Sequence, residues 1–260
     1  MPWFRGTAAP PFQGTAVPRH RRSKALRYRG TGAAGAEKQS SRATAAGQNS
    51  AMLTPTRATQ RVTRDRAAVH AVLDEALTCH VGFAAEDRPH VLPTLHARIG
   101  DVLYVHGSTA ARLLTAARPE PLPVCVTVSL LDGLVLARSA FHHSLNYRSV
   151  IIHGNAEYVL DPAAKERALA ALVDRVAVDR STQCRPPTSK ELAATAVLAL
   201  DLDAESTDVA LKARTGPPND DEADLDSGYW AGVIPVRLTA GSAEPACDLP
   251  TPSGLAPSLG

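Results

Sequence analysis

The most informative stretches of the chain are VLPTLHARIGDVLYVHGSTAARLL (residues 91–114) and LARSAFHHSLNYRSVIIHG (residues 136–154). Each is a strand-like pattern that runs into a polar, cationic cluster. The first cluster is His106-Gly107-Ser108 with Arg112 behind it, and the second is Asn146-Tyr147-Arg148-Ser149. Hydroxyls, a glycine and an arginine at a strand-to-helix junction suit a phosphate, because N–H groups at a helix start carry partial positive charge and a guanidinium adds a forked donor. The two stretches therefore predict strands that present anion-binding residues.

Charge divides the chain unevenly. Residues 1–66 contain 13 Lys/Arg and 2 Asp/Glu, a net charge of +11, whereas residues 67–260 contain 15 Lys/Arg and 24 Asp/Glu, a net charge of −9. The first 50 residues are rich in Gly, Ala, Ser, Thr, Pro and Arg and have too few large apolar side chains to offset chain entropy. We predict a disordered basic arm over residues 1–60.

Three interpretations of this basic arm stay open. It could be a tail that binds nucleic acid or an anionic surface, a transit-like segment, or a segment outside the working protein if the chain starts at Met52. For the protein as a whole we do not expect a nucleic-acid partner. No apolar run approaches the roughly 18–20 residues of a membrane span, and no apolar signal region follows the charged start. We therefore expect a cytoplasmic protein without a membrane partner.

Residues 61–240 have the pattern of one domain with a sizeable core, and residues 241–260, rich in Pro, Gly and Ser, predict a disordered tail. The four cysteines lie far apart without CxxC spacing, which supports neither a zinc ribbon nor a redox dithiol. Neither GxGxxG after a strand nor GxxxxGK[ST] occurs, so no motif supports NAD or ATP binding.

Short strands separated by turns, with a few helices between them, make up the domain pattern. Asp65 predicts a helix start, since Val69, Val72 and Leu73 follow at helical spacing, and Asp161-Pro162 predicts another. Shorter helices are expected at 109–117 and near Ser189. We expect strands at 79–86, 89–99, 102–107, 123–131, 134–139, 149–160, 195–202, 208–214 and 232–239, with turns at Asp87-Arg88 and Asp132-Gly133. The strand order is not βαβ, which favours a mainly β (α+β) fold, a partly closed antiparallel barrel with peripheral helices.

Over about residues 64–240 the chain resembles the pyridoxamine 5′-phosphate oxidase-like FMN-binding split-barrel family, in particular its bacterial flavin-nucleotide-binding subgroup. The resemblance implies an antiparallel split β-barrel with peripheral helices and FMN as the cofactor. It also implies a homodimer that holds the flavin in a groove between the two chains. The residues matched to flavin contacts are Pro93, Thr94 and Leu95 along the ring, His106, Gly107, Ser108 and Arg112 at the phosphate, and Tyr147, Arg148 and Ser149 at the phosphate or ribityl chain.

Other readings of single residues stay open. Arg112 and Arg148 could also be solvated residues at barrel edges. Arg138, His142 and His143 are candidates for the substrate side of the flavin, where a histidine could move a proton near neutral pH; each could equally have a structural role. We expect no metal site, because adjacent histidines on an extended strand point to opposite sides. The acidic stretch 219–224 predicts a solvated loop.

These features predict an FMN-dependent oxidoreductase acting on a small molecule that the sequence does not identify, nor does it identify a catalytic residue. The final strand offers only Arg237, where true pyridoxamine phosphate oxidases have further basic residues, so we do not expect vitamin B6 oxidation. The alternatives are a non-enzymatic flavin carrier or sensor, and a split barrel that uses a deazaflavin or haem.

Overall fold

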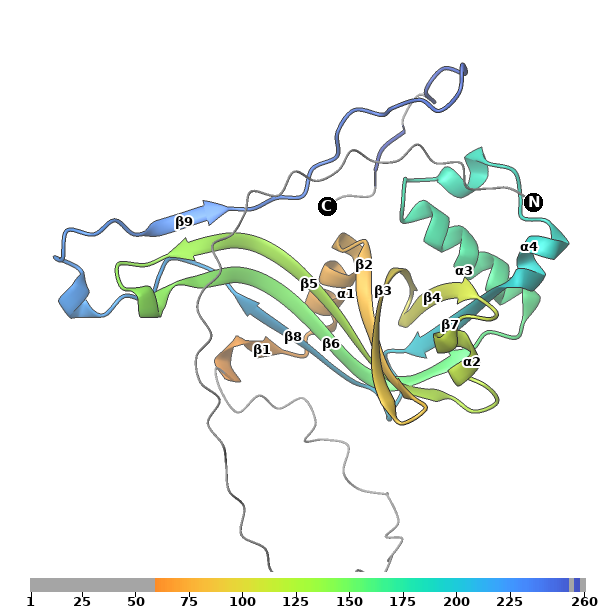
Figure 1. Ribbon diagram of the computed structural model, residues 1–260, viewed down its shortest axis with the longest axis horizontal. Helices are drawn as coiled ribbons and strands as arrows, with labels where there is room; N and C mark the ends of the chain where they lie inside the picture. Colours follow the sequence, from red (N-terminus) through yellow and green to blue (C-terminus); the bar gives the residue numbers. More distant parts are fainter. Residues whose placement is uncertain (1–58, 253–254, 258–260) are drawn as a thin grey trace, which may run out of the picture. The chain divides into compact units, whose positions relative to one another are not determined.

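A computed structural model describes residues 59–252 and 255–257 (Figure 1). The predicted arm over residues 1–60 lies outside these residues apart from its last two. The predicted disorder of residues 241–260 stays a prediction. The helices are α1 (Arg66–Glu75), α2 (Arg112–Ala116), α3 (Pro162–Asp174) and α4 (Ser189–Ala194), with 3-10 turns η1 (Thr59–Arg61), η2 (Ala140–His142), η3 (Arg180–Gln183) and η4 (Glu222–Asp224). The strands are β1 (Val62–Thr63), β2 (Thr78–Ala85), β3 (Arg88–Ile99), β4 (Val102–Ser108), β5 (Leu122–Leu136), β6 (Ser144–Tyr158), β7 (Thr195–Asp201), β8 (Asp208–Arg214) and β9 (Gly232–Pro235).

Six strands close a ring. The sheet order is β1-β8-β6-β7-β4-β3-β2-β5-β9, and β5 also pairs with β6, so that β2, β3, β4, β7, β6 and β5 form a closed circuit of antiparallel pairs. The link between β6 and β7 is short, only Glu157↔Ala199 and Tyr158↔Leu198. Beyond the ring, β5 and β6 continue as a long pair flanked by β8 and β9 (Figure 1). The predicted fold, an antiparallel split barrel, is confirmed.

Every second side chain along the strands points inward, and these side chains fill the barrel. In β5 the side chains of Val124, Val126 and Val128 are buried, whereas the residues between them are more exposed. The cavity left among Val81, Leu198 and their neighbours is only about 10 Å³. That space is too small for a cofactor, so any ligand site must lie outside the barrel.

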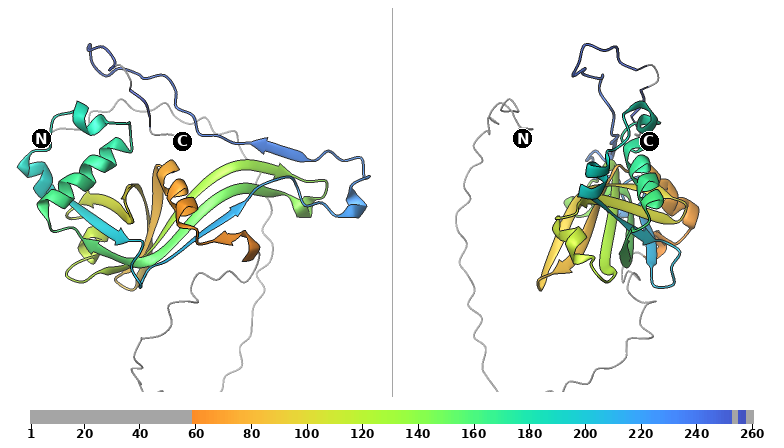
Figure 2. Two further views of the ribbon diagram at one scale, coloured as in Figure 1. Left: turned by 180° about the vertical axis from the view of Figure 1, so that it is seen from behind. Right: turned by 90° about the vertical axis from the view of Figure 1, so that its right-hand side faces the viewer.

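The two longer helices begin where their sequences predict. The Asp65 carboxylate accepts a hydrogen bond from Ala68 N at 2.8 Å, and Asp161 does the same for Ala164 N at 2.8 Å, with Pro162 as the first residue of α3. Helix α3 lies against β3, β4 and β7. Two turned views show α3 and α4 at one end of the barrel and β9 with the far end of the β5–β6 pair at the other (Figure 2). Among the helices of the described region, none is long and apolar enough for a membrane crossing.

The turn between β2 and β3 lies one residue earlier than predicted. Glu86 and Asp87 both have positive φ, 52° and 56°, and they join strands that pair Ala85 with Arg88. Two central residues in the left-handed region match the right-handed twist of the flanking strands. The turn prediction at Asp87-Arg88 was therefore wrong by one position.

The hairpin predicted at Asp132-Gly133 was wrong. Strand β5 runs through this dipeptide with a bulge between Leu131 and Gly133, and the chain reverses only after Leu136. Gly133 pairs with Asn146 on one side and Pro235 on the other. A Cβ atom at Gly133 would lie 3.1 Å from the carbonyl oxygen of Ile234, so this glycine permits the close approach of β9 and does not form a turn.

Candidate functional site

The turn at His106-Gly107-Ser108, which was predicted to bind a phosphate, packs against α2. A Cβ atom at Gly107 would lie 3.0 Å from Cδ2 of Leu114, so the glycine lets α2 pack against β4. The Ser108 hydroxyl accepts a 3.3 Å hydrogen bond from Ala110 N, which helps to form the turn into α2. Arg112, the first residue of α2, is exposed, and within residues 59–252 its guanidinium has no hydrogen bond or ion pair. Arg112 is thus free to meet an anion from solvent.

The second predicted cluster lies in the middle of the long β5–β6 pair. Arg148 donates to Glu75 at the end of α1 and to Asp132 of β5, and both carboxylates lie within 2.7 Å of Nη2. These hydrogen bonds raise the pKa of Arg148 above its usual range, despite the opposing effect of burial. The Ser149 hydroxyl lies 3.1 Å from that of Ser129. Arg148 is therefore already saturated by protein carboxylates, and its predicted contact with a phosphate would require it to leave them.

No hydrogen bond or ion pair joins the two clusters within the described residues. Arg148 is held by Glu75 and Asp132, whereas Arg112 is exposed and its guanidinium has no partner there. Their sharing of one flavin phosphate stays a prediction.

Strand β3 offers the surface predicted for the flavin ring. Pro93 is exposed, Thr94 and Leu95 are half-buried, and they pair with His80, Cys79 and Thr78 of β2. Val91, two residues earlier, is 69% exposed. This part of β3 is accessible to a ligand or to another chain, and its contact with a flavin stays a prediction.

Arg138 and its neighbours hold a loop in place. Arg138 donates from its backbone N and from Nη1 to Asp220, at 2.9 and 2.7 Å, and the Asp220 side chain is only 2% exposed. Desolvation alone would raise the pKa of Asp220, but the hydrogen bonds and charge of Arg138 outweigh it, so the pKa lies below its usual range. The prediction of a solvated acidic loop was wrong at this residue, because the Asp220 carboxylate is buried and a buried carboxylate requires a cationic partner, here Arg138.

The adjacent histidines point to different partners. His142 Nε2 lies 3.2 Å from Asp221, and His143 Nδ1 lies 3.0 Å from the carbonyl oxygen of Ser139. Among the described residues, no three His, Cys, Asp or Glu side chains are grouped to hold a metal ion. The position of His142 and His143 on the substrate side of a flavin stays a prediction.

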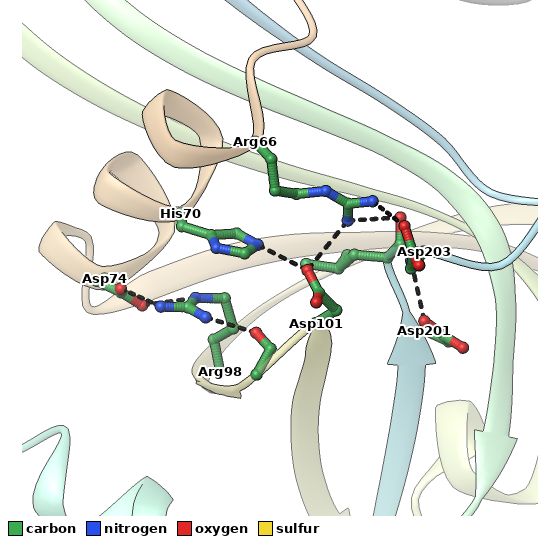
Figure 3. A network of polar contacts seen from close by, with 9 residues as sticks. Arg66, His70, Asp74, Arg98, Asp101, Asp201 and Asp203 are labelled. Carbon is green, nitrogen blue, oxygen red and sulfur yellow. Dashed lines mark hydrogen bonds and ion pairs between the residues drawn. The ribbon is translucent and has the colours of Figure 1, made fainter.

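A network of charges fixes α1 to two loops (Figure 3). Arg66 donates to the Leu202 carbonyl oxygen at 2.9 Å and lies 3.3 Å from Asp101, which is also 3.1 Å from His70 Nε2. On the same side of α1, Arg98 Nε donates to Asp74 at 2.9 Å. His70 and Arg98 are partly buried and the other side chains are exposed, and all of them pair with one another, as in a structural network.

A pocket lies between α3 and the sheet. Its volume is about 870 Å³, within the roughly 300–1,000 Å³ typical of cofactor and ligand pockets. Apolar side chains make most of its lining, among them Leu95, Leu169, Leu172, Val173, Val176 and Leu192. Polar residues from η3, α4 and the segment between them also line it, and of these Arg185 and Glu191 form a bidentate ion pair at 2.6 and 2.9 Å.

Two predicted site residues, Leu95 and His106, line this pocket, and His106 is the histidine among its lining residues. Val105 beside it is directed into the barrel core, so alternation along β4 places His106 on the opposite face, toward α3. Its Nδ1 atom is shielded from solvent and has no hydrogen-bond partner in the part of the chain that the structure describes. Burial lowers the pKa of His106, which favours the neutral imidazole. The sequence pattern contained the alternation, but it did not indicate that α3 would cover this face.

Comparison with known proteins places the chain in a family. The family model described as pyridoxamine 5′-phosphate oxidase matches residues 65–209. No curated protein matches. The flavocytochrome Anf3 from Azotobacter vinelandii is 40% identical, with 77% of this chain and 92% of that chain covered and a TM-score of 0.70. The FAD and heme binding protein from Mycobacterium smegmatis is 33% identical, with 77% and 100% covered and a TM-score of 0.71. This chain therefore belongs to the pyridoxamine 5′-phosphate oxidase family of split-barrel proteins.

Proposed function

We propose that this protein is a redox protein that binds a flavin and, as a second cofactor, haem. Both relatives described above carry names that state a flavin-type and a haem-type cofactor, and this chain spans 92% and 100% of their lengths. A bound flavin exchanges one or two electrons and a bound haem iron exchanges one, so the pair supports electron transfer between a small molecule and an acceptor.

The flavin half of the proposal is supported by accessible residues. The exposed residue Pro93 of β3 can lie along a ring system, and the guanidinium of Arg112, which is exposed and has no partner among the described residues, can meet a phosphate. FMN is the flavin that the sequence predicts, whereas the name of the mycobacterial relative states FAD. Release of the flavin by heat, followed by chromatography against both standards, identifies which one this chain holds.

We also propose a homodimer. The resemblance to the split-barrel family implies a flavin groove between two chains, and the two predicted clusters make no direct contact in the described part of one chain. Apolar side chains on the long β5–β6 pair are exposed, among them Leu131 (45%) and Leu145 (47%). Exposed apolar patches of this kind mark contact surfaces. Sedimentation equilibrium of the full chain tests this state.

The pocket under α3 is the single observation that supports haem as the second cofactor. It has cofactor size and mostly apolar walls, and it contains an imidazole whose nitrogens have no partner among the described residues. An apolar pocket with a neutral histidine is the donor set that haem uses, so the residues present fit the group.

An absorption spectrum of the purified full chain tests the proposal. Flavin bands together with a Soret band are the expected result. A protein that takes up neither flavin nor haemin on titration would contradict it. Anaerobic addition of NADH or NADPH then separates an oxidoreductase, in which the flavin bands bleach, from a carrier or sensor, in which they stay.

A further inference from the structure

We propose that His106 is the axial ligand of the haem and that the pocket under α3 is the haem site. This inference rests on the proposed function, because it names the residue and the surface that would hold the second cofactor. Nothing in the family match or in the names of the relatives assigns either of them.

The position of His106 supports this assignment. His106 lies on the outer face of β4, one residue beyond the pair Val105↔His96, and Leu95 of β3 lines the same pocket. Helix α3 covers this face and contributes Leu169 and Val173. A flat, apolar macrocycle gains free energy when it leaves water for such walls, and His106 is the histidine among the lining residues.

The state of the imidazole also fits. Metal ligation needs a neutral ring with a free nitrogen lone pair. Among the described residues, Nδ1 is enclosed by protein without a partner, whereas Nε2 makes no hydrogen bond and is not among the enclosed atoms. Nε2 is therefore the nitrogen open to a ligand in the pocket.

The absence of an acceptor for Nδ1 has a consequence for the iron. Histidine ligands usually donate their second N–H to an acceptor, which makes the ring a stronger donor. Among the described residues, Nδ1 of His106 has no such acceptor. We therefore expect His106 to be a weak axial ligand that exogenous imidazole can supplement or replace.

Most other histidines of the described region are already engaged, and none lines this pocket. Five lie within contact distance of a protein group: His70 near Asp101, His96 near Leu73 O, His142 near Asp221, His143 near Ser139 O and His153 near Cys125. His90 stacks on Phe83, and His80 is exposed on β2. His80 therefore provides a matched control outside the pocket.

The test is titration of the full-length, haem-free protein with haemin, followed by its Soret band. We expect His106→Ala to bind haemin at least about tenfold more weakly than wild type, since losing even an outer partner of a metal ligand costs roughly 10–100-fold in affinity. His80→Ala should match wild type. Added imidazole should restore the wild-type spectrum to the His106→Ala complex, which a merely structural role for His106 would not produce.

A second variant keeps the pocket assignment testable if His106→Ala does not fold. Ala170→Trp leaves His106 in place and fills the pocket from α3, so it should abolish haemin binding while circular dichroism and flavin content stay unchanged. Wild-type affinity and spectrum in either folded variant would overturn the inference and leave the proposed function standing. A wild-type protein that binds no haemin would instead contradict the haem half of the proposed function.

Discussion

Arg148 and Asp132 form a bidentate pair across β5 and β6, with Nε 3.0 Å from Oδ2 and Nη2 2.7 Å from Oδ1. Glu75 approaches the same guanidinium from α1. The three side chains are each about one-third exposed, at 30%, 29% and 33%. One guanidinium thus joins the helix to the two longest strands.

Replacement of Arg148 should destabilise the fold. Arg148→Ala leaves two partly buried carboxylates facing each other, and loss of hydrogen bonds to charged groups costs roughly 1.5–3 kcal/mol, with the lower end expected at this exposure. Arg148→Lys should restore part of the loss, because the charge survives without the fork. Urea unfolding measures the change. Thr182→Ala, an exposed control, should stay within about 0.5 kcal/mol, and an equally small effect of Arg148→Ala would show that the triad is not structural.

Gly133 should tolerate a side chain poorly. A Cβ atom there would lie 3.1 Å from Ile234 O and 3.1 Å from Val233 Cγ1, so Gly133→Ala must push β9 away from β5. Overpacking of this kind typically costs about 1–3 kcal/mol. Hydrogen exchange should show faster exchange at residues 232–235 in the variant. Gly241→Ala, where nothing lies within 4 Å of the new Cβ atom, is the matched control.

The sequence predicted local structure well where a side chain binds backbone groups a few residues away. Asp65 and Asp161 are caps, and their helices begin where expected. Asp132-Gly133 has the composition of a turn, yet tertiary pairing with β9 converts it into a bulge. Strand β9 lies about 100 residues further along the chain, so the local pattern around Asp132-Gly133 could not indicate this pairing.

The surroundings of the site residues could not be predicted for the same reason. The pattern identified His106 and Arg148 as polar residues near the ends of expected strands, whereas Arg148 lies inside β6 and the surroundings of both come from distant elements. Helix α3 turns the face of His106 into a pocket, and Glu75 with Asp132 saturates Arg148. The sequence therefore located chemically notable side chains and could not show which of them stay free to bind a ligand.

His96 should make the fold sensitive to acid. Its ring is fully buried, Nε2 lies 2.9 Å from the Leu73 carbonyl oxygen, and burial lowers its pKa, with a smaller opposing effect from the hydrogen bond. The unfolded chain then binds a proton near pH 6.5 while the folded chain does not. The stabilisation is complete above about pH 6.5 and is lost as the pH falls below it.

Urea unfolding between pH 7.5 and 5 measures this dependence. His96→Leu removes the titrating ring and should flatten the fall in the free energy of unfolding with decreasing pH, though it also loses the hydrogen bond to Leu73. His80→Leu, at an exposed position, should leave the slope as in wild type. An unchanged slope in His96→Leu would assign the acid sensitivity to other groups, of which His106 is one, since burial lowers its pKa too.

Arg112 is the free cation among the predicted phosphate residues, and its replacement tests the flavin site directly. If its guanidinium meets the flavin phosphate, Arg112→Ala should weaken binding by roughly 1.5–3 kcal/mol, about ten- to a hundredfold in Kd. Arg112→Lys should recover part of this, and riboflavin, which lacks the phosphate, should bind wild type and Arg112→Ala equally. Because Arg112 is exposed and has no protein partner in the region from 59 to 252, the unfolding free energy should change by less than about 0.5 kcal/mol. Flavin fluorescence quenching gives the affinities. Wild-type affinity for FMN and FAD in Arg112→Ala would remove Arg112 from the flavin site and would leave the split barrel and the pocket under α3 unaffected.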